Sequence, residues 1–214
     1  MRRPMRTDFF LEGLQAINWT VEDRGLAGIS DLEGIPWTMP MEQFFEAWVE
    51  TVMRCVSRQL GGAIKAGRRR ETVSPLAWDP PYLGSQRSLV PDIILEIDGT
   101  SFIADAKYKR HWEEFQQRDW AAQSASLREQ HRTDLLQVLA YSNLAATANI
   151  VCCLVYPCSQ ETWESLKGRR RLFHQAELPN RGRSIQVWLT AVPMGTPINA
   201  IAAPFVQQIR KTGN

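Results

Sequence analysis

Apolar residues recur at helical spacing across residues 41–60, and this stretch predicts a long amphipathic helix. The apolar positions lie three or four residues apart and are Phe45, Trp48, Val49, Val52, Met53 and Val56. Pro40 suits the start of this helix, and Gly61 suits its end, because glycine readily takes the left-handed conformation of a helix C-cap. Three glutamates, at positions 42, 46 and 50, form a stripe that we expect to face solvent, although Glu46 borders the apolar face and could reach an interior site.

The helical spacing gives way to two short apolar runs between residues 89 and 110, on either side of Asp98-Gly99. An Asp-Gly pair in this setting predicts a β-hairpin with a type I′ turn. Counting outward from that turn places Asp92 opposite Asp105, and strand alternation places Lys107 on the same face as Asp105. Facing carboxylates repel each other, so we expect a divalent cation with oxygen ligands between them.

Further segments complete the pattern. Residues 133–145 predict a helix with Thr133 as its N-cap, Asp134 in its first turn and an apolar stripe of Leu135, Leu136, Leu139 and Leu144. Residues 149–156 predict a strand buried on both faces, 184–192 an alternating strand, and 198–210 a closing helix. A strand is also expected near residues 71–76, and 158–183 are expected to form a charged connector.

This order of elements predicts an α/β or mixed α+β fold, with a mixed sheet of four or five strands flanked by helices. Residues 1–39 are expected to be an N-terminal extension, a short helix from about Asp8 followed by a loop rich in glycine and proline. Residues 40–214 are then expected to form one domain.

The composition excludes few classes of function. Hydrophobic residues make up 44% and charged residues 22% of the 214 residues, which is typical of a globular protein. The net charge of +2 is too small to indicate nucleic-acid binding by itself, so attention falls on two arginine clusters, at 68–70 and 169–171. The absence of a long apolar run predicts a cytoplasmic protein without a membrane span, and its four cysteines are expected to be thiols.

Pro91-Asp92, a gap of twelve residues, and then Asp105-Ala106-Lys107 resemble the motif of the PD-(D/E)XK nucleases. The preceding helix with Glu46 and the later pair Gln137 and Tyr141, four residues apart, also fit that superfamily. Within it, the strings ADAKYK and DLLQVLAYS resemble the McrC nuclease subunit of McrBC-type restriction systems, over about residues 41–156. The resemblance implies a restriction-endonuclease-like core over residues 40–214.

The resemblance also implies a chemistry, hydrolysis of DNA phosphodiester bonds with Mg²⁺, for which Mn²⁺ could substitute. Asp92, Asp105 and the backbone carbonyl of Ala106 would be metal ligands, and Glu46 would bind through water or hold a second ion. Lys107 would position the attacking water or help to deprotonate it. Gln137 and Tyr141 would orient Lys107 or contact the phosphate backbone.

Four basic residues near the motif are candidates for DNA contact, and they are Lys109, Arg110, Arg68 and Arg69. The expected partners are DNA and an AAA+ NTPase of the McrB type, or another subunit of a defence system. One site per chain cannot cut both strands of a duplex, so a homodimer is a further expectation.

Two other functions compete with a restriction endonuclease. One is a catalytically silent nuclease-fold subunit that binds DNA or a partner. The other is a stand-alone exonuclease or junction resolvase. Intact Asp92, Asp105 and Lys107 count against the silent subunit, because a degenerate site usually loses one of these residues.

Overall fold

The computed structural model describes residues 40–109, 123–180 and 182–212 of the chain. The polypeptide divides into two compact units, Met1–Met39 and Pro40–Asn214, and only the second is described here. The helix expected from about Asp8 therefore lies outside the described residues. Within the described ranges, no helix combines the length and apolar character needed to cross a membrane.

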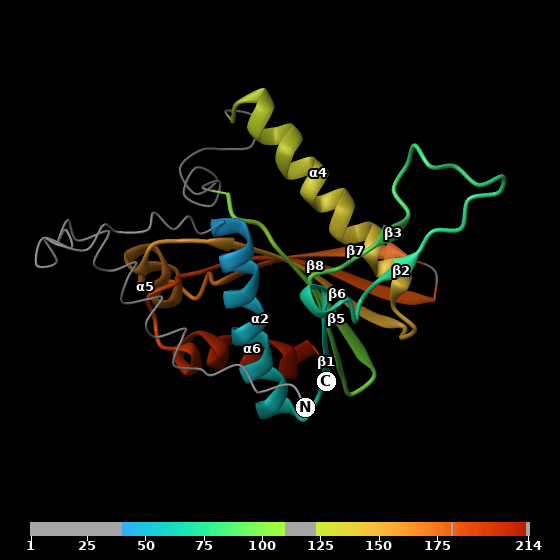
Figure 1. Cartoon of the computed structure of the whole chain (residues 1–214). Helices are drawn as coiled ribbons and strands as arrows, with labels where there is room; N and C mark the ends of the chain where they lie inside the picture. Colours follow the sequence, from blue (N-terminus) through green and yellow to red (C-terminus); the bar gives the residue numbers. More distant parts are fainter. Residues whose placement is uncertain (1–39, 110–122, 181, 213–214) are drawn as a thin grey trace, which may run out of the picture. The chain divides into compact units, whose positions relative to one another are not determined.

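A six-stranded mixed sheet forms the centre of the described unit, in the order β1-β4-β5-β6-β8-β7 (Figure 1). Its strands are β1 (Ala63–Ala66), β4 (Ile93–Ile97), β5 (Thr100–Ala106), β6 (Asn149–Pro157), β7 (Phe173–Asn180) and β8 (Arg183–Val192). The strands β5, β6 and β8 are parallel, while β1 and β4 on one side and β7 on the other run antiparallel to their neighbours. The mixed α+β class predicted from the sequence is confirmed.

Helices pack on this sheet and on each other. They are α2 (Met41–Leu60), α4 (Ala125–Tyr141), α5 (Gln160–Gly168) and α6 (Ile198–Thr212), with short 3-10 turns at η1 (Gly67–Arg69) and η3 (Ser142–Leu144). The helix α2 packs against α6, β4 and β5, whereas α4 packs against β5 and β6. Trp48 of α2 is buried, and its indole N–H donates to the carbonyl of Pro193 at 3.0 Å, which ties α2 to the segment after β8.

The central hairpin has the predicted turn and register. Asp98 and Gly99 have φ values of 46° and 76°, as a type I′ turn requires at both positions. Ile97 pairs with Thr100 and Ile93 with Ala104. In β4 the side chains of Ile93, Leu95 and Ile97 are buried, which gives the strand one face in the core.

The sheet has more strands than the four or five expected. The predicted connector 158–183 contains α5, whose N-cap Ser159 accepts from the backbone N–H of Thr162 at 3.1 Å, and the edge strand β7. Most side chains of β7 between His174 and Leu178 are exposed, so this strand lacks the apolar alternation that would have predicted it. The strand β1 is only four residues long.

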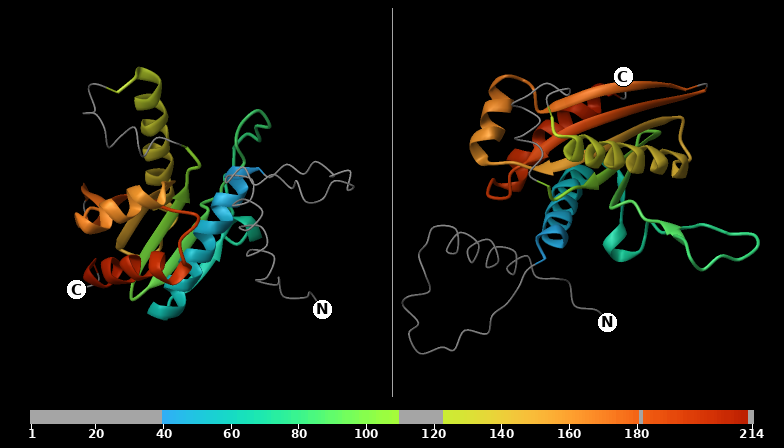
Figure 2. Two further views of the ribbon diagram at one scale, coloured as in Figure 1. Left: turned by 90° about the vertical axis from the view of Figure 1, so that its left-hand side faces the viewer. Right: turned by 90° about the horizontal axis from the view of Figure 1, so that it is seen from above.

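The strand expected at residues 71–76 is reduced to β2 (Ser74–Pro75), which pairs with β3 (Ser88–Leu89) in a separate two-stranded ribbon. The residues between β2 and β3 extend away from the sheet, as both views in Figure 2 show.

The helix α4 differs most from its prediction. It begins at Ala125 and not at Thr133, because Ser124 caps it by accepting from the backbone N–H of Leu127 at 3.2 Å. The predicted leucine stripe is wrong, since Leu136 is 59% exposed. The buried face consists of Leu127, His131, Asp134, Val138 and Tyr141. This face is largely polar, so an apolar pattern could not identify it.

Candidate active site

The hairpin brings Asp92 to the end of β5. The last regular pair is Ile93 with Ala104, and Asp92 lies one residue beyond it, as the register predicts. The Oδ2 atom of Asp92 accepts a hydrogen bond of 2.8 Å from the backbone N–H of Ala106. The side chain of Asp92 thus bridges to the other strand immediately next to Asp105.

Asp105 is 1% exposed, and its Oδ2 atom lies 2.5 Å from the Nζ atom of Lys107. The two residues alternate along β5 and its extension, which directs both side chains to one face. Burial lowers the pKa of the Lys107 ammonium, but Asp105, Asp92 and Asp134 together more than offset this effect, and the pKa is raised overall. Lys107 therefore stays protonated beside a buried carboxylate.

Burial is the main cause that raises the pKa of both aspartates. The pKa of Asp92 rises to about 7, mainly because the carboxyl is buried and also because Asp105 is close, while the Ala106 N–H opposes the rise. Burial raises the pKa of Asp105 as well, and Lys107 opposes that increase. Two carboxyls held together in this way favour either a proton or a cation between them.

Glu46 approaches the same site from α2. Its side chain is half-buried, and burial raises its pKa, an effect that Arg68 opposes and that Glu50 and Asp105 reinforce. The three glutamates therefore do not all face solvent, contrary to the expectation from the sequence. Glu42 is exposed, but Glu50 is buried and forms an ion pair of 2.7 Å with Arg54.

A chain of hydrogen bonds connects Lys107 to α4. The Lys107 ammonium donates to Gln137 Oε1 at 2.9 Å, and the Gln137 amide donates to the Tyr141 hydroxyl at 2.8 Å. The Tyr141 hydroxyl in turn donates to the carbonyl of Val90 at 3.4 Å, two residues before Asp92. Of the predicted pair on α4, Gln137 thus contacts Lys107 directly, and Tyr141 connects Gln137 to the segment that carries Asp92.

Sequence reasoning missed a second polar cluster beside the first. The Lys109 ammonium contacts both oxygens of Asp134, at 2.7 and 2.9 Å, and Asp134 is 3% exposed. The Tyr156 hydroxyl donates to Asp134 at 3.3 Å and also lies 3.3 Å from His131 Nδ1. Asp134 was expected in a first helical turn, where its charge would suit the helix dipole. Its spacing of three residues from Gln137 places the two side chains at neighbouring positions on the helix surface.

Two further residues hold the Pro91-Asp92 backbone in place. The Thr72 hydroxyl is buried and donates to the Pro91 carbonyl at 2.6 Å, and the Asp92 carbonyl accepts from the Gly67 N–H at 2.8 Å. A Cβ atom on Gly67 would lie 2.7 Å from the Pro91 carbonyl oxygen. Only glycine allows η1 to approach this strand so closely.

The candidate DNA-contacting residues differ in their surroundings. Arg68 and Arg69 are exposed on η1, and Arg68 is close enough to Glu46 to lower the pKa of that carboxyl. Arg69 also lies 3.7 Å from Glu50. Lys109 forms an ion pair with Asp134, and Arg110 lies outside the described residues.

The four cysteines are free thiols, and Cys152 and Cys153 are fully buried in β6. Burial raises the pKa of Cys152 to about 12, so its thiolate does not form at neutral pH. Across the residues that the structure describes, no set of three or more histidine, cysteine, aspartate or glutamate side chains is arranged to enclose a metal ion. A cation at this site would therefore depend on the Asp92 and Asp105 pair, a donor set of hard oxygens suited to Mg²⁺, which commonly uses one or two carboxylates and keeps several waters.

Comparison with known proteins places these residues in one family. A search of curated proteins finds no match to the chain. The family model described as McrBC 5-methylcytosine restriction system component matches residues 28–157. This match covers more than half of the 214 residues, and it includes Glu46, Asp92, Asp105, Lys107 and the paired residues of α4. The chain therefore belongs to the McrBC 5-methylcytosine restriction system component family.

Proposed function

We propose that this restriction system component is the nuclease subunit, and that it hydrolyses phosphodiester bonds of DNA with the help of a divalent cation. The observation that carries the proposal is the grouping of Asp92, Asp105 and Lys107 at one end of the sheet, with Lys107 held by Gln137. A stabilising role alone does not account for this grouping, because burying two carboxylates side by side costs free energy.

Asp92, Asp105 and, through water, Glu46 are the residues that would hold Mg²⁺, together with the Ala106 carbonyl. When bound, the cation would acidify a water and stabilise the negative charge that develops on the phosphate. The residues of the chain have separate tasks. The two aspartates supply negative charge, and their strands fix its position.

Lys107 would orient the attacking water and hold it against the phosphate. Its ammonium forms an ion pair with Asp105 and donates a hydrogen bond to Gln137, and an ammonium has three N–H donors, so it can also donate to a water or a phosphate oxygen. Gln137 is solvent-exposed, so the Lys107 side of the site is open to a large substrate. Tyr141 fixes Gln137 and thereby the direction of the ammonium.

The experiment that tests this proposal is plasmid cleavage with Mg²⁺ or Mn²⁺, in the presence of the NTPase partner of the system. Asp105→Asn and Lys107→Ala should each lower cleavage by at least about a hundredfold, as expected for loss of a group that acts on the transition state. Glu42→Gln is the matched control, because Glu42 is exposed on the same helix as Glu46.

Equal cleavage by the parent and both variants would show that this site is not the catalytic centre. A parent that binds Mg²⁺ and DNA without cutting would favour the catalytically silent subunit. Cleavage of linear or branched DNA without cleavage of circular DNA would favour the exonuclease or junction resolvase.

The proposed partners follow from the family membership and the proposed nuclease activity. Membership in the family makes other subunits and DNA expected partners, and an AAA+ NTPase of the McrB type is the proposed one. A homodimer is proposed as the arrangement that supplies two sites for the two strands of a duplex.

A further inference from the structure

Residues 74–89 form an arm that stands away from the sheet (Figures 1 and 2). The strands β2 and β3 pair over only two residues each, and the loop between them makes up the rest of the arm. We call this segment the 74–89 arm.

The arm has an internal structure of its own. The indole N–H of Trp78 donates to the Gln86 carbonyl at 2.9 Å, and the rings of Trp78 and Tyr82 meet edge to face with centroids 6.3 Å apart. The Leu76 N–H donates to the Arg87 carbonyl at 2.8 Å. These contacts cross the loop, so its side chains are presented from a defined scaffold.

Apolar side chains are concentrated on this arm and beside it, although they are exposed there. Five of the eight exposed large hydrophobic residues in the described part of the chain are Val73, Leu76, Trp78, Tyr82 and Leu83. Leu83 is 76% exposed and Tyr82 is 58% exposed. Leaving such side chains in water gains nothing for folding, so their grouping indicates a surface that a partner covers.

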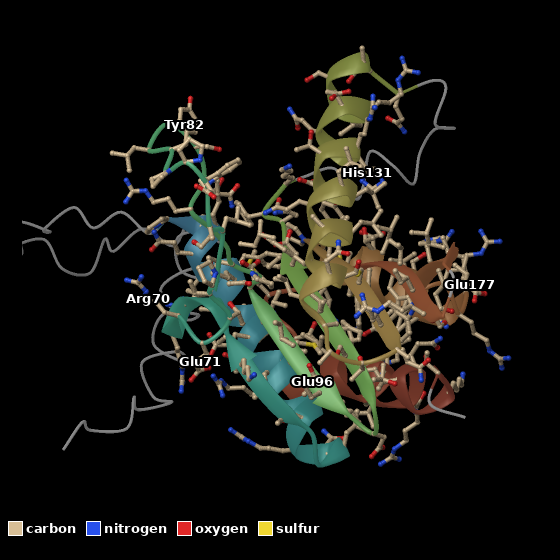
Figure 3. The ribbon with its side chains drawn as sticks, turned by 90° about the vertical axis from the view of Figure 1, so that its right-hand side faces the viewer. Arg70, Glu71, Tyr82, Glu96, His131 and Glu177 are labelled. Atoms are coloured by element: carbon tan, nitrogen blue, oxygen red, sulfur yellow. The ribbon has the colours of Figure 1, made fainter. Side chains whose placement is uncertain are left out.

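The base of the arm is attached to the candidate active site on both sides. The Pro91 carbonyl accepts from Thr72, which precedes β2, and the Val90 carbonyl, which follows β3, accepts from Tyr141. In Figure 3 the arm with Tyr82 at its end and the helix with His131 rise from the same end of the sheet, and Arg70 lies near the base of the arm. A substrate at Asp105 would therefore extend past this base.

The charge near the arm identifies the partner. Arg68, Arg69 and Arg70 are exposed at its base, and Arg87 is exposed on the arm itself. Two acidic residues are also exposed there, Asp79 on the arm and Glu71, whose carboxylate accepts from the Ala66 N–H at 2.9 Å, so the arginines outnumber them. Arginines beside exposed aromatic and aliphatic side chains suit DNA, because the cations neutralise phosphates while the apolar groups pack on bases or sugars.

We propose that the 74–89 arm is a DNA-binding arm, in which the arginines at its base hold phosphates next to the active site while Tyr82 and Leu83 pack against nucleotides further along the duplex. This inference rests on the proposed function, because it takes DNA as the substrate of the adjoining site. The arm would bind DNA through residues that are separate from the proposed catalytic residues.

The test is DNA binding by the full chain, measured as fluorescence anisotropy of a labelled duplex without divalent cation over a series of salt concentrations. The variant Tyr82→Ser with Leu83→Ser should weaken binding by about tenfold, the range that loss of one aromatic contact to a base gives. Its slope of affinity against salt should match that of the parent, since no ion pair is lost. Arg68→Ala should instead reduce that slope by about one.

Leu178→Ser is the matched control, because Leu178 is 44% exposed on β7 at the far edge of the sheet. It should bind DNA like the parent. An unchanged affinity in the Tyr82 and Leu83 double variant would overturn the inference. So would a double variant that binds DNA normally but no longer associates with the NTPase subunit, because the arm would then bind protein.

Failure of the proposed function gives a different result. A parent that binds DNA through the arm but never cleaves it would refute the nuclease proposal and leave the arm as a DNA-binding surface. Normal cleavage with normal binding in the double variant would refute the arm and leave the nuclease proposal in place.

Discussion

Asp92 and Asp105 come from different strands, and burial makes it costly for either to carry a charge. The pKa of Asp92 rises to about 7, and that of Asp105 is raised as well. The Lys107 ammonium lies 2.5 Å from Asp105 and compensates part of its charge, whereas the Asp92 carboxyl accepts a hydrogen bond from the uncharged Ala106 N–H. A bound cation would neutralise the remaining negative charge of the two carboxylates.

Asp92 should make Mg²⁺ binding depend on pH. The pKa of Asp92 lies above its unfolded value of 3.8, so the metal-free fold is most stable below that value and loses this contribution as the pH rises toward about 7. Mg²⁺ must displace the same proton, so its affinity should rise with pH, by up to about tenfold per unit, and level off above the pKa. Calorimetric titration with Mg²⁺ across this range measures the effect.

Asp92→Asn should remove most of the Mg²⁺ affinity and its pH dependence, because the amide keeps the shape of the side chain without the charge. Asp79→Asn is the control, since Asp79 is exposed on the arm. A pH dependence that persists in the Asp92 variant would assign the titrating group elsewhere.

At the scale of elements, the short turn η1 sets the position of Asp92. The Gly67 N–H bonds to the Asp92 carbonyl, and the turn lies so close to Pro91 that a side chain at position 67 has no room. The helix α4 acts from the other side, since its buried polar face carries Tyr141 next to Val90 and Asp134 next to Lys109. Asp92 is therefore positioned by elements that supply no metal ligand.

Gly67→Ala should destabilise the protein by about 1–3 kcal/mol, the usual cost of overpacking, and should also weaken Mg²⁺ binding. The added Cβ would lie 2.7 Å from the Pro91 oxygen and 3.3 Å from the Asp92 Cα, so the strand must shift. Urea unfolding measures the first effect and calorimetry the second.

Gly195→Ala is the comparison, because a Cβ at Gly195 meets no atom within 4 Å and should have little effect on either quantity. Destabilisation by Gly67→Ala with unchanged Mg²⁺ affinity would show that η1 supports the fold without positioning Asp92.

At the scale of the whole molecule, the family match ends at residue 157, the last residue of β6. Of the elements beyond this point, β8 and β7 extend the sheet and α6 packs against α2, while Trp48 of α2 donates to the Pro193 carbonyl. The described part of each chain contains one grouping of Asp92, Asp105 and Lys107, so under the proposed function one chain would hydrolyse one strand at a time.

Double-strand cleavage should therefore need two intact chains. Mixing the parent with an excess of the Asp105→Asn chain should convert linear plasmid products into nicked circles, because most parent chains would then be paired with an inactive chain. Gel electrophoresis of the products over a series of mixing ratios measures this. A ratio of linear to nicked product that does not change with mixing would mean that a single chain cuts both strands.

The sequence alone determined the hairpin, because an Asp-Gly turn constrains two backbone positions and fixes every pair that follows. It therefore predicted that Asp92 and Asp105 lie at the same end of two paired strands, with Lys107 beside Asp105. It also predicted the extent of α2, since a strong apolar spacing and a terminal glycine are local features. The roles assigned to these residues remain predictions.

The tertiary structure alone decided the surroundings of the site. The predicted leucine stripe of α4 was wrong because the helix buries His131, Asp134 and Tyr141 against a polar part of the sheet, and polar burial leaves no apolar periodicity. The strand β7 was missed because an edge strand with exposed side chains resembles a connector. The contacts of Gly67, Thr72 and Asp134 depend on segments far apart in the sequence, and only folding brings them together.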